Sequence, residues 1–232
     1  MTDYLTLQPL LALALTLAVF AAARCLSSRS SEHPLANPVL VSVVVIIALL
    51  SITGTPYEGY FAGAQFIHFL LGPAVVALAV PLFRNLSRVR RSALPVLVSI
   101  AIGSASGVLS IVLIAWAFSA QEQLAASLVT KSATAPVSMA IAPQLGGVPA
   151  LAALFSVLTG MCGAAFGPTL LNRLGIEEPM QRGLAMGTAS HGQGTARILQ
   201  ESEETGAFSA LAMGLTALAM AVFLPALARF IL

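Results

Sequence analysis

Apolar runs long enough to cross a bilayer follow one another along almost the whole chain, and they constrain the fold more than any other feature. They lie at about residues 5–24, 38–53, 66–83, 93–118, 148–171 and 206–231. A helix crosses the hydrocarbon core with about 20 apolar residues. Only 9% of the 232 residues are charged, against about 25% in soluble domains. We therefore predict an all-α polytopic membrane protein, residues 1–232 forming a single transmembrane domain with about seven spanning helices.

The placement of charge predicts how the chain is oriented. Four arginines, Arg84, Arg88, Arg90 and Arg91, separate two apolar runs, as in a cytoplasmic loop of a bacterial inner-membrane protein. The first apolar run follows Asp3 and no basic residue, so we expect a retained helix rather than a cleaved signal peptide. Nucleic-acid binding is not expected, because it needs a basic face on a soluble module.

Several segments are predicted to be broken or re-entrant helices. Gly72-Pro73 interrupts an apolar run, and proline breaks or kinks a helix. Residues 121–143 are too polar to face lipid, so they form either a re-entrant hairpin or a full crossing. The hairpin is favoured because it places both basic loops, 84–91 and the polar loop expected at 172–182, in the cytoplasm. Residues 183–200 are mixed in polarity, and their orientation stays open.

A weak internal repeat relates two parts of the chain. Residues 73–81 resemble residues 136–143, and each segment is followed by a proline-opened, glycine-rich run, at Leu94-Pro95 and Val148-Pro149. Paired, interrupted segments are typical of transporters built from inverted repeats. We expect such an inverted repeat here.

The first of two polar islands covers residues 130–136. Thr134 and Ser132 precede Pro136. We expect a half-helix to begin at Pro136, with these two side chains capping its exposed backbone N–H groups. With Lys131 alongside, the positive end of that half-helix suits a small anion such as a carboxylate. The alternative is a polar loop lying in water at the membrane surface.

The second island covers residues 187–197, where glycines permit close backbone approach or a positive φ. His191 is a candidate proton-coupling group, and Arg197 can hold a carboxylate with two hydrogen bonds. The alternative is a cytoplasmic loop between helices. The remaining candidate ligand contacts are Thr188, Ser190, Gly192, Gly194 and Thr195, with Gln144 from a predicted turn at 144–147.

His68 is a second candidate for proton coupling, unless it simply bonds a neighbouring carbonyl. No enzyme chemistry is predicted. Ser190-His191 has no orienting acid, and Gly192-x-Gly194 lacks the third glycine and the strand of a dinucleotide site. The two cysteines show no metal-binding spacing, so neither a metal nor a cofactor is expected.

At these islands the chain resembles the LrgB/CidB family of bacterial membrane proteins. The most specific stretch is Arg182-Gly183-Leu184-Ala185-Met186-Gly187-Thr188-Ala189-Ser190-His191-Gly192. Other matching stretches are 37–40, 55–58, 69–74, 77–82, 131–136, 144–147, 194–197 and 206–209, so that the resemblance covers about 37–215. The chain departs from the family pattern at Gln193, where an apolar residue is usual, and at Ala133-Thr134-Ala135.

The resemblance implies two alternative functions. Some family members look like carriers of small carboxylates such as glycolate, glycerate or pyruvate, with a small LrgA/CidA-type membrane partner. Others are described as holin-like or antiholin-like regulators of murein hydrolases and lysis, a role that needs oligomerising helices. We expect a carrier working by alternating access, because a lysis pore has no use for buried polar islands. Homo-oligomers are compatible with both functions.

Overall fold

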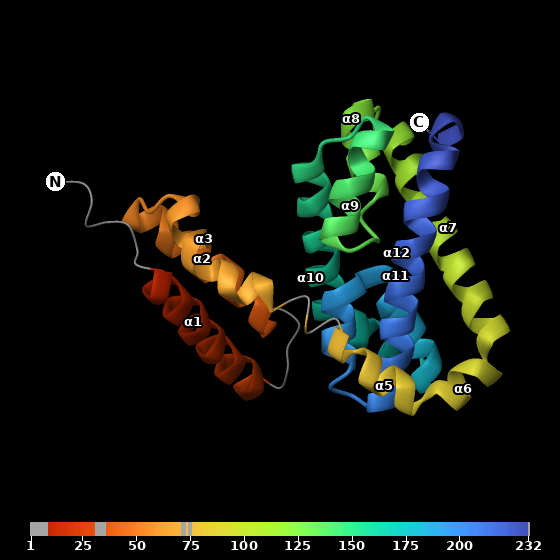
Figure 1. Cartoon of the computed structure of the whole chain (residues 1–232), viewed down its shortest axis with the longest axis horizontal. Helices are drawn as coiled ribbons and strands as arrows, with labels where there is room; N and C mark the ends of the chain where they lie inside the picture. The colour runs from red at the N-terminus through yellow and green to blue at the C-terminus, as the bar shows by residue number, and fades with distance from the viewer. Residues whose placement is uncertain (1–8, 31–35, 71–72, 74–75, 232) are drawn as a thin grey trace. The chain divides into compact units, whose positions relative to one another are not determined.

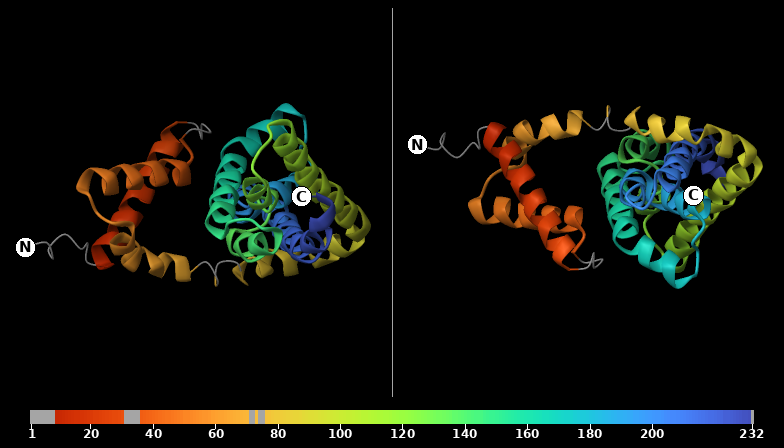
Figure 2. Two further views of the ribbon diagram at one scale, coloured as in Figure 1. Left: turned by 90° about the horizontal axis from the view of Figure 1, so that it is seen from above. Right: turned by 90° about the horizontal axis from the view of Figure 1, so that it is seen from below.

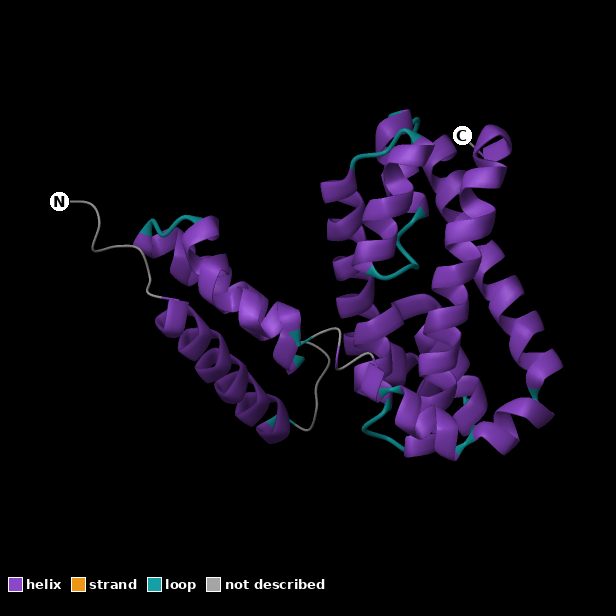
Figure 3. Ribbon diagram, viewed as in Figure 1, coloured by secondary structure: helices purple, strands orange, loops and turns teal. Residues whose placement is uncertain are grey.

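The structure is a computed structural model, and it describes residues 9–30, 36–70, 73 and 76–231. These residues form helices, turns and loops and contain no strand, which confirms the all-α prediction (Figure 3). The chain divides into two compact units, residues 1–77 and residues 78–232. A single domain over the whole chain stays a prediction.

The first unit contains α1 (Pro9–Arg29), α2 (Pro38–Thr53) and α3 (Tyr57–Phe69). Asn37 caps α2, its Oδ1 accepting from the backbone N–H groups of the second and third residues after it. The three helices meet around Tyr60, whose hydroxyl lies 2.9 Å from the Thr16 hydroxyl. Gly72, at the predicted break, and the side chain of His68 lie outside the described residues.

Three long helices frame the second unit: α7 (Ala93–Ala117), α10 (Pro149–Arg173) and α12 (Glu203–Ile231). Together with α1 they are the four described helices that are long and apolar enough to cross a membrane. α2 is apolar but has only 16 residues. The figure of about seven spans stays a prediction.

The basic loop between the apolar runs is itself helical. Arg84 ends α5 (Ala79–Arg84), whose other residues belong to the preceding apolar run, and Leu86–Arg91 form α6. Arg84 pairs with Glu203 at 2.9 Å, and Arg88 pairs with Glu204. These ion pairs join α5 and α6 to the beginning of α12.

Residues 122–145 form a structure that we call the first hairpin. It consists of α8 (Glu122–Val129), a turn, α9 (Ala135–Ile141) and the short 3-10 helix η3 (Ala142–Leu145). The backbone N–H of Val148, just after the hairpin, donates to the Ser127 hydroxyl at 2.8 Å. The chain therefore leaves this hairpin beside the helix by which it enters, as expected for a re-entrant segment.

Residues 179–201 form the second hairpin, built from α11 (Pro179–Ile198). α11 reverses sharply at His191, where φ is 39° and ψ is −129°. Arg182, near its beginning, binds Glu201, just beyond its end, at 2.8 Å. A straight helix would hold those residues about 28 Å apart. The polar loop predicted at 172–182 is wrong at its end, because α11 already begins at Pro179.

The two hairpins approach along α12 from opposite ends of the second unit (Figure 1). Leu184 of the second hairpin packs against Phe208 and Ala212 in the first half of α12. Ala133 of the first hairpin belongs to a cluster with Met220, in the second half of that helix. Figure 2 shows the long helices around the hairpins when the unit is viewed end-on. This opposition places the two hairpin tips next to each other; the inverted repeat stays a prediction.

Candidate functional site

The two tips meet at one side chain of α10, the fully buried Ser156. Its hydroxyl donates to the carbonyl of Ala133 in the first hairpin at 2.5 Å. Its own carbonyl lies 2.9 Å from Nε2 of His191 in the second hairpin, and since a carbonyl only accepts, Nε2 is the donor. We call this meeting point of the polar islands the junction.

The tip of the first hairpin is held by its own backbone. The Ser138 hydroxyl donates to the Thr130 carbonyl at 2.7 Å, which closes the turn between α8 and α9. The predicted cap is wrong: Thr134 precedes α9, but its side chain makes no capping hydrogen bond. Pro136 is the second residue of α9 and is exposed. The half-helix therefore begins where expected, stabilised by Ser138 instead.

The tip of the second hairpin is a buried histidine in an unusual backbone conformation. The sequence indicated that glycines would provide any positive φ here, but His191 itself adopts φ 39°. Residues other than glycine are rarely found in such conformations, and those found are concentrated at functional sites. His191 is 5% exposed, so packing around the ring and its bond to Ser156 hold the strained turn in place.

α7 contacts both tips through its glycines. A Cβ at Gly103 would lie 3.2 Å from Cγ2 of Thr188, and a Cβ at Gly107 would lie 3.5 Å from Oγ of Ser132. The four-residue spacing of small residues in α7 thus allows one helix to approach both hairpins.

α10 covers the junction from another direction. A Cβ at Gly160 would lie 2.6 Å from Cε1 of His191 and 3.0 Å from Oε1 of Gln193, and one at Gly163 would collide with the Ser190 side chain. Glycine is required at both positions because the polar side chains of the second tip occupy the space that a Cβ would fill.

The structure separates the predicted site residues into two groups. Lys131, Ser132, Thr188, Ser190 and His191 lie at the hairpin tips. Lys131 is half-buried, and its charge acts on the His191 ring.

The other predicted residues lie away from the junction or are engaged elsewhere. The Thr195 hydroxyl bonds Ser209 of α12 at 2.9 Å. Arg197 is half-buried in the last turn of α11, about 9 Å along the helix from His191. Gln144 is exposed at the open end of the first hairpin, where it donates to Ala140. Gly192 faces Met213, and Gly194 lies against Ser190.

Two residues with central roles were missed from the sequence. Ser156 is one of three hydroxyl residues in the apolar run at 148–171, and a polar group at membrane depth is the signal that could have identified it. Arg182 is 7% exposed and binds both oxygens of Glu201, at 2.8 and 2.9 Å. It also donates to Asn172 and to the carbonyl of Ile176, and so closes the base of the second hairpin.

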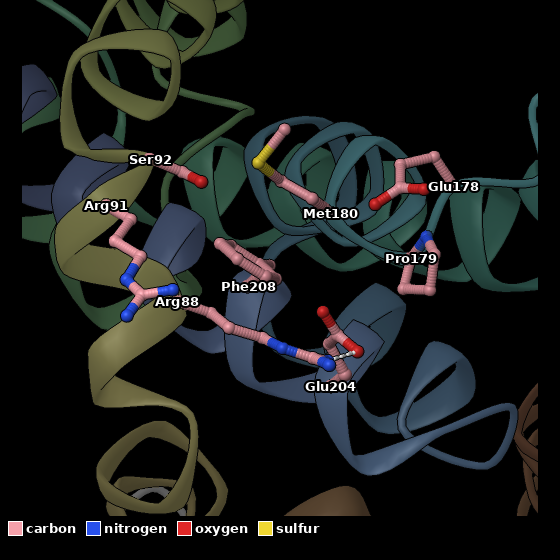
Figure 4. Close-up of a pocket in the computed structure, with 8 residues that line it drawn as sticks. All are labelled: Arg88, Arg91, Ser92, Glu178, Pro179, Met180, Glu204 and Phe208. Carbon is pink, nitrogen blue, oxygen red and sulfur yellow. Dashed lines mark hydrogen bonds and ion pairs between the residues drawn. The ribbon is translucent and has the colours of Figure 1, made fainter.

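A cleft opens at the base of each hairpin. At the second hairpin a cleft of about 420 Å³ lies between α6, α11 and α12, and the Arg88–Glu204 pair crosses it (Figure 4). At the first hairpin a cleft of about 580 Å³ is lined by residues 121–123 and by Leu145 and Gly146. The junction lies between these two clefts. Among the described residues, no three histidine, cysteine or acidic side chains gather as a metal site.

Long apolar helices that surround two opposed hairpins with buried polar tips define the class: a multi-pass α-helical membrane protein. The model of the LrgB-like family matches residues 16–230, and the chain belongs to that family. It is a multi-pass bacterial membrane protein.

Relatives match over most of the chain. The Bacillus subtilis protein YxaC, named as uncharacterized, is 37% identical over 83% of this chain and 84% of its own length. The holin-like protein CidB of Staphylococcus aureus (strain N315) is 34% identical over 98% of both chains. CidB of Staphylococcus epidermidis (strain ATCC 12228) is 32% identical with the same coverage. No solved structure matches the chain.

Proposed function

We propose that this protein carries small carboxylates across the inner membrane by alternating access, with its substrate site at the junction. The observation that carries the proposal is the bridge through Ser156, which joins Ala133 in one hairpin tip to His191 in the other. A substrate bound there would contact both hairpins at once, so its binding would be coupled to their movement.

The charge at the junction favours an anion. Lys131 is half-buried and acts on His191, and charged groups at membrane depth are costly and generally functional. The hydroxyls of Ser132, Thr188 and Ser190 offer hydrogen bonds to carboxylate oxygens. His191, the ring that bridges the tips, is the proposed proton-coupling group.

The two clefts support alternating access. Each lies at the open base of a different hairpin, so in our proposal each is the route to the junction from one side of the membrane. Opposed, interrupted helices with a substrate site between them are typical of transporters built from inverted repeats. We further propose about seven spans, and a small LrgA/CidA-type membrane partner as the resemblance implies.

Uptake into proteoliposomes tests the proposal. Vesicles containing the protein, with and without such a partner, receive labelled glycolate, glycerate or pyruvate. We expect saturable uptake that Lys131→Met and His191→Ala each reduce at least about tenfold, because a single charge-assisted hydrogen bond accounts for that much. Arg173→Gln, at the exposed end of α10, is the matched control and should leave uptake unchanged.

The second candidate function is that of a holin-like regulator of lysis, which the names of the CidB relatives favour. It predicts the opposite result in the same vesicles. If no acid enters even with the partner present, while unrelated solutes of similar size leak out, the carrier proposal is wrong and the holin-like function stands.

A further inference from the structure

Three buried polar atoms around the second hairpin tip are not hydrogen-bonded to any of the described residues. They are Oγ of Ser104 in α7, Oε1 of Gln193 in α11 and Oγ1 of Thr216 in α12. More than nine in ten buried polar groups in proteins have a partner, so a group without one calls for a physical explanation.

Contacts place the three atoms at one level of the second unit. Ser104 follows Gly103, the residue of α7 that lies against Thr188. Thr216 lies one turn beyond Met213, whose Sδ is 3.8 Å from the Cβ position of Gly192. Gln193 is part of the tip itself. All three polar groups therefore lie around the second tip, near its meeting with the first.

Gln193 lies closest to the groups that form the junction. Its Oε1 lies 3.0 Å from the Cβ position of Gly160, and Cε1 of His191 lies 2.6 Å from that same point. The Gln193 amide and the His191 imidazole therefore lie next to each other, both packed against Gly160. The same imidazole donates a hydrogen bond to the Ser156 carbonyl. A ligand held by Lys131 and His191 would have the Gln193 amide beside it.

The chemistry of this amide oxygen restricts what it can bind. An amide oxygen only accepts hydrogen bonds, and so does an ionised carboxylate, so the two do not pair. With Oε1 facing the His191 ring, a donor on the uncharged part of the ligand can supply the missing hydrogen bond. A hydroxyl is such a donor, whereas a keto oxygen or a hydrogen on carbon is not.

We propose that Gln193 is a specificity-determining residue, which favours carboxylates with a hydroxyl on the carbon next to the carboxylate over those with a keto group there. This inference rests on the proposed carrier function and adds to it the residue that recognises the substituent. A site built to bind a hydroxyl discriminates well, because an analogue without the hydroxyl leaves the buried polar group unpaired.

Lactate and pyruvate are the matched probes, since they differ only in the hydroxyl or keto group. Uptake of each enantiomer of lactate and of pyruvate is measured in proteoliposomes for the full chain, for Gln193→Met and for Gln200→Met. We expect at least one lactate enantiomer to be preferred over pyruvate by about tenfold, with the preference lost in Gln193→Met. Gln200→Met should behave as the original chain, because Gln200 is exposed and follows α11.

Binding gives a second readout that does not depend on turnover. The rise in unfolding temperature caused by each acid in detergent should show the same preference, and the same loss in Gln193→Met and in Gln193→Leu. Equal use of both acids by the original chain, or a preference that survives in Gln193→Met, overturns the inference while the carrier function stands. If neither acid is bound or carried while glycolate or glycerate is, this inference fails and the carrier function stands. If none of the four acids is bound or carried, both fail.

Discussion

At the residue scale, His191 combines two properties that rarely occur together. It is the polar group that joins the hairpins through Ser156, and it is also the residue at which α11 reverses. A glycine would make that turn without strain. The structure therefore retains a strained residue at the position where the proposed function needs an imidazole.

Replacing His191 by glycine and by alanine separates its two roles. Both changes remove the bond to Ser156, so both should reduce uptake to the same low level. His191→Gly relieves the positive φ, whereas His191→Ala keeps it, so the glycine variant should be more stable by about 1 kcal/mol. For a chain of this length that corresponds to an unfolding temperature about 2–4 °C higher, measured in detergent. An alanine variant as stable as the glycine variant would show that the turn is not strained.

The sequence identified some residues of the site and not others, for a physical reason. Lys131 and His191 lie in polar segments that lipid would not tolerate, so composition alone reveals them. Ser156 is one of three hydroxyl residues in an apolar run, and its importance depends on which carbonyls it contacts. Such contacts depend on tertiary packing, which a single sequence does not reveal.

At the scale of elements, an ion pair between Arg182 and Glu201 holds the two arms of the second hairpin together at its base. The Arg182 side chain is 9% exposed and that of Glu201 is 28% exposed, and the arginine also binds Asn172 and Ile176. A comparable pair, Arg84–Glu203, is 66% and 48% exposed. Both are arginine–glutamate pairs, but the buried arginine makes four hydrogen bonds and the exposed one binds its glutamate through a single bond.

Arg182→Gln should therefore be far more destabilising than Arg84→Gln. Removing one partner of a buried ion pair leaves the other unpaired and costs about 3–5 kcal/mol, and partial exposure of Glu201 places the expected loss near 2–4 kcal/mol. The exposed pair should contribute about 1 kcal/mol or less. Denaturant unfolding in detergent micelles compares them. Similar losses for both variants would mean that Arg182 does not hold the two arms of the second hairpin together.

Element boundaries were predictable where lipid dictates them. α2, α7 and α10 match the apolar runs to within about two residues, because a helix facing lipid has to be apolar along its length. The beginning of α11, residues 179–182, was mistaken for a loop, because it contains Gln181 and Arg182 and follows two acidic residues. It packs against α7, α10 and α12 rather than lipid, so its helical structure needs no hydrophobic surface.

At the scale of the whole second unit, the two hairpin bases are expected to face opposite sides of the membrane. The arginines of α5 and α6 lie at the base of the second hairpin, and the positive-inside rule places that base in the cytoplasm. The base of the first hairpin, at residues 121–123, then faces outward.

Cysteine labelling in intact cells tests this arrangement. In a Cys25→Ser, Cys162→Ser background, a cysteine at Gln123 should react with an impermeant maleimide added outside. A cysteine at Glu178 should react only after the membrane is permeabilised. Both side chains are exposed, so the reaction reports the side of the membrane. If both positions react from the outside, the hairpins enter from the same side and the alternating-access proposal loses its structural basis.

The meeting of the tips at Ser156 has an electrical consequence. Where water fills both clefts, little of the membrane voltage falls across them, because voltage drops mainly across material of low dielectric constant. In the proposed carrier the cleft on the open side extends to the junction, and the full potential then acts over the side chains that close the other side. Moving one negative charge across 100 mV involves about 2.3 kcal/mol. A carboxylate that moved only a short distance past Lys131 and His191 would therefore cross the whole membrane potential and gain or lose that full electrical energy.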